Sequence, residues 1–370
     1  MKIVIVSAAR VPSDTANSIQ VMKVCQAFAQ LGHETILLVP GPLPPVSDLN
    51  QHYGLTRSFK VEWLPGRNRR MFPWTAVWRA RALGADLLYA WPVQSAWLSP
   101  LLGIPSMLEM HDYPVGSFGP LWYRMFLRLP GKKRLLPITE ALYRGLMEKY
   151  GPMPGGRVVI SPDGVDLERY EALPDPPEAR RLCNLPELAT ILCTGHLYEG
   201  RGADLFLALA EKFPQAGFVW VGGRPEDVKH WQAQATGKRL VNVTFTGFIT
   251  NDRIPLYQAA ADILLMPYGR AISGSSGGDI SGVYSPMKMF EYMAAGRAIL
   301  SSDLPVLREV IDGSMAVFCP PEDVDSWVGA LDSLLGDPQR RQALGESARA
   351  AVSKYSWIER ARRALQGFNE

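Results

Sequence analysis

Short apolar segments alternate with helical patterns along most of this chain, and this alternation limits the fold more than any other feature. Lys2–Ser7 and His33–Val39 are rich in β-branched and aliphatic residues, and the helical pattern of Ile19–Leu31, which ends at Gly32, lies between them. Such segments are typical of buried parallel strands joined by a right-handed crossover helix. We therefore predict a doubly wound α/β sheet that begins near the N-terminus.

The same alternation continues through the first half of the chain. Asp86–Ala90 and Ser106–Met110 have the composition of strands, and Glu140–Tyr150 has the pattern of a helix. Ligands of open parallel sheets bind beyond the carboxyl ends of the strands. We therefore expect three segments that follow strands to lie at one crevice: Ser7–Ser18, Trp91–Gln94 and His111–Asp112.

A proline-rich segment interrupts the alternation. Arg157–Ile160 is predicted to be the last strand of the first half, and Leu173–Pro177 has the composition of a linker. The alternation then restarts at Thr190–Thr194, and a chain of 370 residues exceeds what one hydrophobic core usually holds. We expect two doubly wound, Rossmann-like α/β domains that face each other across a cleft, over residues 1–165 and 166–355, with a C-terminal helix over residues 356–370 that packs back on the first.

The composition excludes several classes of protein. With 47% apolar and 20% charged residues, the chain has the make-up of a soluble globular protein. Its four cysteines lie far apart without CxxC spacing, so we expect neither a zinc site nor a disulfide framework. The opening strand is too short for a signal peptide, and no Gly-x-Gly-x-x-Gly for a dinucleotide cofactor follows it. We expect a cytoplasmic protein.

The segment Tyr284–Asp303 combines the features of an anion site. Ser285 is a good N-cap and Pro286 suits a first helical turn, so we expect a helix from Pro286 to a stop at Gly296. A glycine- and serine-rich loop over residues 274–282 precedes this helix. The free N–H groups at a helix start after such a loop form a natural phosphate site.

Two charged residues lie near this helix start. Lys288 and Glu291 are three residues apart, on one face of the helix. A cation and a carboxylate beside a helix start suit a ligand with both phosphate and hydroxyl groups, such as a nucleotide sugar. The alternative is an ordinary capped helix with a solvated ion pair.

Four segments follow one another in an order found in a known family. They are Ser161–Asp166, Thr194–Gly202, Val243–Ile249 and Ser285–Gly296. Together they resemble the retaining glycosyltransferases of family 4, which have the glycosyltransferase-B fold. The resemblance implies transfer of a sugar from a nucleotide diphosphate sugar, with retained anomeric configuration, to a hydroxyl acceptor in glycan, polysaccharide or glycolipid assembly. It implies no metal and no cofactor, and we expect a UDP- or GDP-linked donor.

The resemblance also implies a role for each matching residue of the second half. Glu291 corresponds to the carboxylate that accepts hydrogen bonds from the nucleotide ribose, and Arg201 to the cation that binds the diphosphate leaving group. A helix ion pair and a solvated surface arginine are the respective alternatives. His196 is also expected to bind the donor, or else it fills its turn. The main chain of Gly247, Phe248 and Ile249 is expected to contact the base. The remaining donor-binding residues expected are Ser285, Met287 and Lys288.

In the first half, His111 corresponds to the histidine that the family places against the donor sugar. The resemblance implies that His111 orients the sugar or acts electrostatically, together with Arg201, and is not a nucleophile, because the family reaction takes place on one face of the sugar. The departing diphosphate then takes the acceptor proton. The alternative is a histidine with a purely structural role in the core or a turn. Asn17 and Ser18 extend the resemblance and are expected in a loop on the acceptor side.

One position departs from the family pattern. Members commonly carry two glutamates that are eight residues apart. Glu291 corresponds to the second of them, and Val283 occupies the place of the first. A backbone contact from Met287 or Lys288, or the Asp279 carboxylate, could substitute for it. The departure keeps open a catalytically silent nucleotide-sugar-binding protein, and an epimerase or phosphorylase on the same scaffold is a further alternative.

Cationic and aromatic residues are interleaved in two clusters of the first half. Residues 1–170 hold 19 Lys and Arg against 12 Asp and Glu, whereas the rest of the chain holds 20 against 24. Such clusters suit peripheral binding to an anionic membrane, where a lipid-linked rather than a free saccharide acceptor would lie. The alternative is that these segments are helices that bury their aromatic side and solvate their charges. No nucleic-acid-binding motif accompanies them. The residues are Arg67, Arg69, Arg70, Met71, Phe72, Trp74, Trp78, Arg79 and Arg81, then Trp122–Arg128 and Lys132–Arg134.

Overall fold

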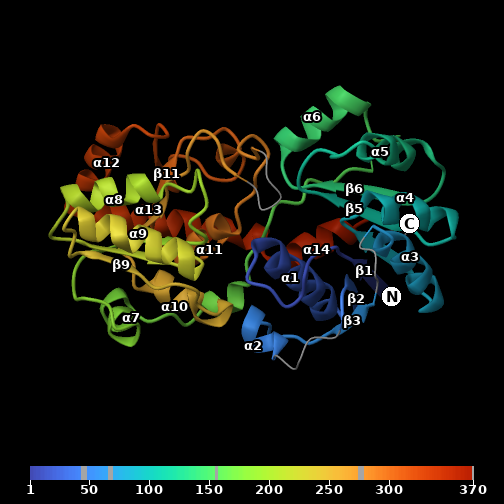
Figure 1. Ribbon diagram of the computed structural model, residues 1–370, viewed down its shortest axis with the longest axis horizontal. Helices are drawn as coiled ribbons and strands as arrows, with labels where there is room; N and C mark the ends of the chain where they lie inside the picture. Colours follow the sequence, from blue (N-terminus) through green and yellow to red (C-terminus); the bar gives the residue numbers. More distant parts are fainter. Residues whose placement is uncertain (43–47, 66–69, 155–156, 274–278, 369–370) are drawn as a thin grey trace. The chain divides into compact units, whose positions relative to one another are not determined.

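The computed structural model describes residues 1–42, 48–65, 70–154, 157–273 and 279–368 (Figure 1). Within these ranges the chain forms two compact units, and it passes from one to the other four times. Unit 1 comprises Met1–Asp163, Val283–Ser285 and Trp357–Glu370, and unit 2 comprises Gly164–Gly282 and Pro286–Ser356.

Unit 1 is built on a six-stranded parallel sheet with the order β3-β2-β1-β4-β5-β6. The paired strands run in register, with Val4 opposite Ile36 on one side and Leu88 on the other. The strands are β1 (Lys2–Val6), β2 (Glu34–Pro40), β3 (Lys60–Leu64), β4 (Leu87–Ala90), β5 (Ser106–Met110) and β6 (Lys133–Pro137). The helices are α1 (Ala16–Gln30), α2 (Leu49–Tyr53), α3 (Phe72–Ala82), α4 (Val93–Leu101), α5 (Gly119–Arg128), α6 (Glu140–Tyr150) and α14 (Trp357–Leu365).

Unit 2 repeats this architecture with the strand order β12-β11-β10-β7-β8-β9, again with every pair parallel. Phe206 packs edge-on against Phe218 and Trp220 in its core. The strands are β7 (Thr190–Thr194), β8 (Gly217–Val221), β9 (Val243–Phe245), β10 (Ile263–Met266), β11 (Ala298–Ser302) and β12 (Ala316–Cys319). The helices are α7 (Pro176–Leu182), α8 (Ala203–Lys212), α9 (Pro225–Gly237), α10 (Ile254–Ala259), α11 (Met287–Ala295), α12 (Val324–Gly336) and α13 (Pro338–Ala351).

The two doubly wound parallel sheets confirm the predicted fold class, but the predicted strand over Arg157–Ile160 is wrong. That segment makes a single bridge between Val158 and Leu135, flanked by two backbone hydrogen bonds. The edge strands β3, β6 and β12 were not predicted. The reason is visible in β3, where Lys, Glu and Trp interrupt the apolar run because the strand is only half-buried.

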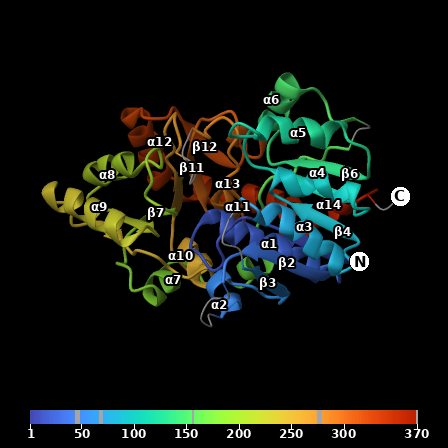
Figure 2. The same cartoon turned by 45° about the vertical axis from the view of Figure 1, so that its right-hand side comes forward.

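The last helix, α14, belongs to unit 1 and packs beside α1 (Figures 1 and 2). Its buried face carries Trp357, Ala361 and Ala364, as expected for an amphipathic helix. The same face also carries Arg360, which is 2% exposed. A buried arginine is costly unless it is paired, so this position points to a polar network inside unit 1.

Candidate functional site

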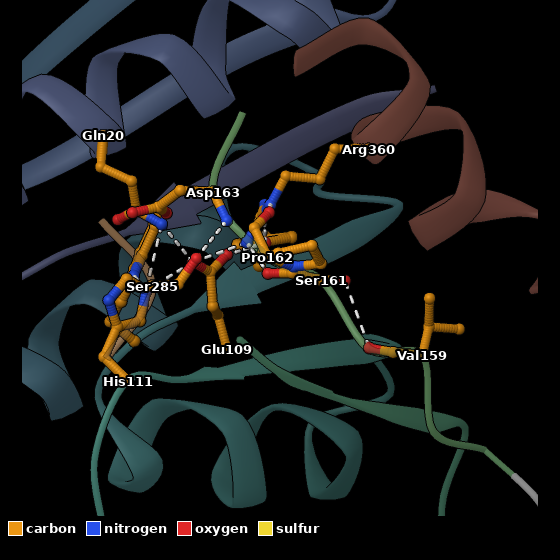
Figure 3. Close-up of polar contacts among 11 residues, drawn as sticks. Gln20, Glu109, His111, Val159, Ser161, Pro162, Asp163, Ser285 and Arg360 are labelled. Atoms are coloured by element: carbon orange, nitrogen blue, oxygen red, sulfur yellow. Dashed lines mark hydrogen bonds and ion pairs between the residues drawn. The ribbon is translucent and has the colours of Figure 1, made fainter. Parts of the chain in front are cut away.

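The carboxyl end of β5 places a buried acid next to the predicted histidine. Glu109 is 1% exposed, and its Oε1 lies 2.6 Å from Nε2 of His111, whose side chain is 33% exposed. Tyr89 at the end of the neighbouring strand donates to the other carboxylate oxygen. His111 therefore lies at the carboxyl end of the parallel strands, with one ring nitrogen turned toward a buried carboxylate (Figure 3).

Arg360 supplies the charge that balances this carboxylate. Its Nη2 lies 2.8 Å from Glu109 Oε1, and its remaining N–H groups donate to Tyr89 OH and to the carbonyls of Ser161 and Pro162. Burial is the largest single influence on the pKa of Glu109 and would raise it, but Arg360, His111 and Tyr89 together outweigh burial and lower that pKa to about 2. Glu109 is thus ionised throughout the physiological range.

Asp163, the last residue of unit 1 before the chain enters unit 2, has the opposite electrostatic character. It is 6% exposed, and burial raises its pKa to about 6, although His111 and Arg360 act in the other direction. Its Oδ1 has no hydrogen-bond partner among the described residues. The backbone N–H of Asp163 donates to Ser285 Oγ at 3.1 Å.

This contact corrects the prediction for Ser285. The residue does not cap α11, because the N-cap is Pro286 and the helix begins at Met287. Ser285 instead belongs to the short segment 283–285 of unit 1, where its hydroxyl accepts from Asp163. Val283, in the place of the missing glutamate, is 6% exposed, and its carbonyl accepts from Thr139 Oγ1.

Asn17 and Ser18 do not lie in a loop. Both belong to the first turns of α1, which begins three residues earlier than predicted. Asn17 is exposed, whereas Ser18 is buried and donates to the carbonyl of Arg10. Ser18 therefore fixes the preceding loop and does not face solvent.

In unit 2, the segment after β7 carries Arg201 between two tightly packed glycines. Gly200 and Gly202 have φ of +77° and +83°, and a Cβ on either would lie within 2.0 Å of a backbone oxygen of the segment after β10. Only glycine fits at these two positions. His196, at the start of the segment, stacks on Tyr198 with 4.9 Å between ring centroids.

Arg201 and Lys288 meet on one aromatic ring. The Arg201 guanidinium lies 5.7 Å from the centre of the Tyr268 ring, and the Lys288 ammonium lies 5.2 Å from it. Lys288 Nζ also lies 3.5 Å from the buried Cys193 Sγ, at the carboxyl end of β7. Unit 2 thus brings two predicted donor-binding cations together at the end of its central strands.

Glu291 and the segment after β9 complete this part of the site. Glu291 Oε2 accepts a hydrogen bond of 3.1 Å from Gln258 on α10. The carbonyl of Gly247 accepts from the N–H of Gly222, Phe248 is exposed and Ile249 and Met287 are half-buried. The predicted donor-binding residues of unit 2 therefore all follow strand ends or lie on α11.

The glycine-rich loop contributes one described acid. Asp279 Oδ1 accepts from the N–H groups of Ile272 and Ser281, and these bonds lower its pKa. Residues 274–278 of the predicted phosphate loop lie outside the described residues. In the described ranges, no three His, Cys, Asp or Glu side chains form a group that could hold a metal.

The cationic clusters of unit 1 are only partly surface features. Lys133 is 5% exposed and donates to the carbonyls of Phe126, Leu127 and Leu129 at the end of α5. Arg134 donates to the carbonyls of Ala364, in the last turn of α14, and of Gln366, just after it. Lys133–Arg134 is therefore structural, and Arg67 and Arg69 lie outside the described residues.

Three residues of this network were not predicted from the sequence: Glu109, Arg360 and Gln20. Gln20 Nε2 lies within hydrogen-bonding distance of both Glu109 Oε1 and His111 Nε2. Two signals were present: Glu109 is the single acid in an apolar strand, and Arg360 falls on the apolar stripe of the last helix. A charge at a position that the periodicity assigns to the core needs a buried partner.

Family models match both halves of the chain. Residues 18–169 match the model described as Glycosyltransferase Family 4, and residues 189–337 match that of Glycosyl transferases group 1. No helix among the described residues has both the length and the apolar character needed to cross a bilayer.

Two curated proteins are similar in sequence over part of their length. The chain is 24% identical to the sulfoquinovosyl transferase SQD2 of Arabidopsis thaliana over 70% of this chain and 51% of that protein. It is 27% identical to a phosphatidyl-myo-inositol mannosyltransferase of Mycolicibacterium smegmatis over 60% of this chain and 58% of that protein. The chain thus spans little more than half the length of these relatives.

A solved structure matches over the whole chain. The Anabaena protein Alr3699/HepE in complex with UDP superimposes with a TM-score of 0.74 and 16% identity, over 100% of both chains. At this identity the match shows the fold, which is the glycosyltransferase-B fold of two Rossmann-like domains.

Proposed function

Because the chain belongs to the group 1 and family 4 glycosyltransferases, we propose that it transfers a sugar from a nucleotide diphosphate sugar to a hydroxyl group, with retention of configuration and without a metal. The observation that carries the proposal is the pair of cations, Arg201 and Lys288, over the Tyr268 ring at the strand ends of unit 2. Two cations suit a diphosphate that gains charge as it leaves.

The remaining assignments extend this proposal. Glu291 binds the ribose hydroxyls, the main chain of Gly247–Ile249 contacts the base, and His111 orients the donor sugar. A UDP-bound neighbour supports a nucleotide ligand, and UDP- and GDP-linked sugars are the donors to test first. The acceptor hydroxyl attacks the sugar on the face that the diphosphate leaves, so no protein side chain acts as a nucleophile, and the departing diphosphate accepts the hydroxyl proton, so no side chain needs to act as a general base.

Donor binding and turnover are tested separately. UDP-, GDP- and ADP-linked sugars are screened by thermal shift, and release of the nucleotide diphosphate is then measured with saccharide and lipid-linked acceptors. Glu291→Ala should abolish the shift of the active donor, whereas Glu346→Ala on the exposed face of α13 should leave it unchanged. An unchanged shift in Glu291→Ala would remove the ribose assignment.

A silent nucleotide-sugar-binding protein is the second candidate, and the observation that favours it is the buried Val283 in the place of the family glutamate. Such a protein would show the thermal shift but release no nucleotide diphosphate with any acceptor. Turnover with one acceptor would exclude it.

We propose a lipid-linked acceptor at an anionic membrane surface, which the relative named as a phosphatidyl-myo-inositol mannosyltransferase supports. Met71 and Trp78 are more than half exposed around α3, as are Phe118 and Leu121 around α5, and the Trp74 and Trp122 rings connect these helices. Exposed apolar side chains beside arginines favour an interface with anionic headgroups. The protein should sediment with anionic but not neutral liposomes at low salt, and Trp78→Ser should weaken this binding.

A further inference from the structure

The ring nitrogen Nε2 of His111 has three polar neighbours in unit 1. Glu109 Oε1 lies 2.6 Å from it, Gln20 Nε2 3.0 Å and Trp91 Nε1 3.2 Å. Only the carboxylate oxygen is an acceptor, because the amide and indole nitrogens both carry hydrogens. The shortest contact thus requires a proton on Nε2, whereas the two longer ones would be hydrogen bonds only if Nε2 carried none.

The protonation state of Glu109 decides between these arrangements. A 2.6 Å contact between a nitrogen and an oxygen needs a proton between them. Glu109 cannot provide it, because Arg360 Nη2 at 2.8 Å and the Tyr89 hydroxyl both hold the carboxylate in its ionised form. The proton therefore lies on Nε2 of His111, which donates to Glu109.

The opposite ring nitrogen faces a different environment. No bond to Nδ1 of His111 is found among the described residues, and the side chain is one-third exposed. In the neutral ring with its proton on Nε2, Nδ1 carries a lone pair. It is then an acceptor for a hydroxyl group.

Arg360 ties this arrangement to the segments that leave unit 1. It donates to the carbonyls of Ser161 and Pro162, immediately before the chain enters unit 2 after Asp163. Arg360 itself lies three residues after Trp357, where the chain returns to unit 1. Figure 3 shows Arg360 and His111 on opposite sides of Glu109, which connects them.

We infer that Glu109 is a positioning residue: it holds His111 in one orientation and in the tautomer protonated at Nε2, so that Nδ1 is presented as an acceptor to a hydroxyl of the donor sugar. Arg360 of the C-terminal helix keeps Glu109 in the charged form that this task needs. The part that concerns the sugar rests on the proposed transferase function, but the tautomer does not.

The tautomer can be measured directly in the full-length protein. The chain has five histidines, so ¹⁵N-histidine labelling gives a small set of ring signals, and His111→Gln identifies the signal of interest. At a pH where the ring is neutral, long-range ¹H–¹⁵N spectra should show the proton of His111 on Nε2. A proton on Nδ1 in the wild-type protein would overturn the inference, and this result requires no variant to fold.

Glu109→Gln provides the second measurement. The amide oxygen that faces Arg360 and Nε2 in this variant is a weaker acceptor than a carboxylate, whereas Gln20 and Trp91 still offer donors to Nε2, so the population should move toward the tautomer protonated at Nδ1. Asp262→Asn, which removes the acid of a similar Arg180 pair in unit 2, is the matched control and should leave the His111 signals unchanged. An unchanged tautomer in Glu109→Gln would also contradict the inference.

Activity gives the third measurement. With the active donor, Glu109→Gln should lower kcat about 10- to 100-fold while the donor KM changes by less than about threefold, because a misplaced imidazole loses alignment with the reacting sugar. A wild-type kcat in this variant would show that the tautomer has no catalytic role. If no donor is turned over at all, the proposed function fails, and the spectra still decide the positioning role.

Discussion

The two units hold their charged groups in different ways. In unit 1, the carboxylate of Glu109 is fully buried and is balanced by Arg360 at 2.8 Å. In unit 2, Lys288 lies over the rings of Trp220 and Tyr268 and near a thiol, and the described residues include no carboxylate in an ion pair with it. A charge that the protein itself balances fixes a geometry, whereas a cation held on aromatic faces remains ready for an anionic ligand.

The largest difference should appear when Arg360 is replaced. Arg360→Met leaves Glu109 buried without its cation, which typically costs about 3–5 kcal/mol of unfolding free energy near pH 7. Urea unfolding measures the loss. Arg180→Met in unit 2 is the matched control and should cost less, because its partner Asp262 is 20% exposed and can be hydrated.

The same variant has a distinct pH dependence. In the wild type the pKa of Glu109 is about 2 when folded, below its usual value. Its contribution to stability is therefore present above about pH 4.5 and is lost as the pH falls toward 2. The gap between Arg360→Met and wild type should shrink on acidification, and a gap independent of pH would contradict a balanced charge pair.

Replacement of Lys288 should affect function and not stability. Lys288→Met removes the cation but keeps an apolar side chain over Tyr268, so kcat/KM for the donor should fall about 100-fold with little change in melting temperature. Lys354→Met is a matched control, since its ammonium also lies 5.2 Å from a tyrosine ring centre, that of Tyr355. Equal losses in both variants would contradict a diphosphate role.

Replacement of Asp163 tests whether this buried acid of unit 1, unlike Glu109, is destabilising when it is ionised. Its folded pKa of about 6 exceeds the usual value, so the folded state binds more protons between about pH 4 and 6 and loses stability as the pH rises through that range. Asp163→Asn should therefore be more stable than wild type by about 3 kcal/mol above pH 7. The gain should vanish near pH 4, and thermal unfolding at the two pH values measures it.

The smallest effect expected is that of Ser285→Ala. Loss of Ser285 Oγ leaves the buried N–H of Asp163 without its acceptor, which costs about 1 kcal/mol. Hydrogen exchange should accelerate at the Asp163 amide and not in the first turn of α11. Faster exchange in the first turn of α11 would instead show that Ser285 caps this helix, the position that Pro286 holds in the structure.

The candidate donor-binding residues of unit 2 could be selected from the sequence because they follow local rules. Arg201 lies between glycines that force one backbone path, and Lys288 and Glu291 share a helix face through their spacing alone. The predicted start of α11 was wrong by one residue. A serine before a proline is typical of an N-cap, and the sequence does not show that the Ser285 hydroxyl instead accepts from Asp163.

The amino-acid sequence by itself determined the two parallel α/β sheets, since apolar strands and amphipathic helices are set by neighbouring residues. Only the tertiary structure decided the partners of Glu109, because Arg360 is far away in the sequence and no local pattern joins them. It likewise turned Lys133 from a candidate membrane contact into a buried cap of α5. Pairing of buried charges depends on which distant segments the fold brings together, and the spacing of residues along the chain does not predict these contacts.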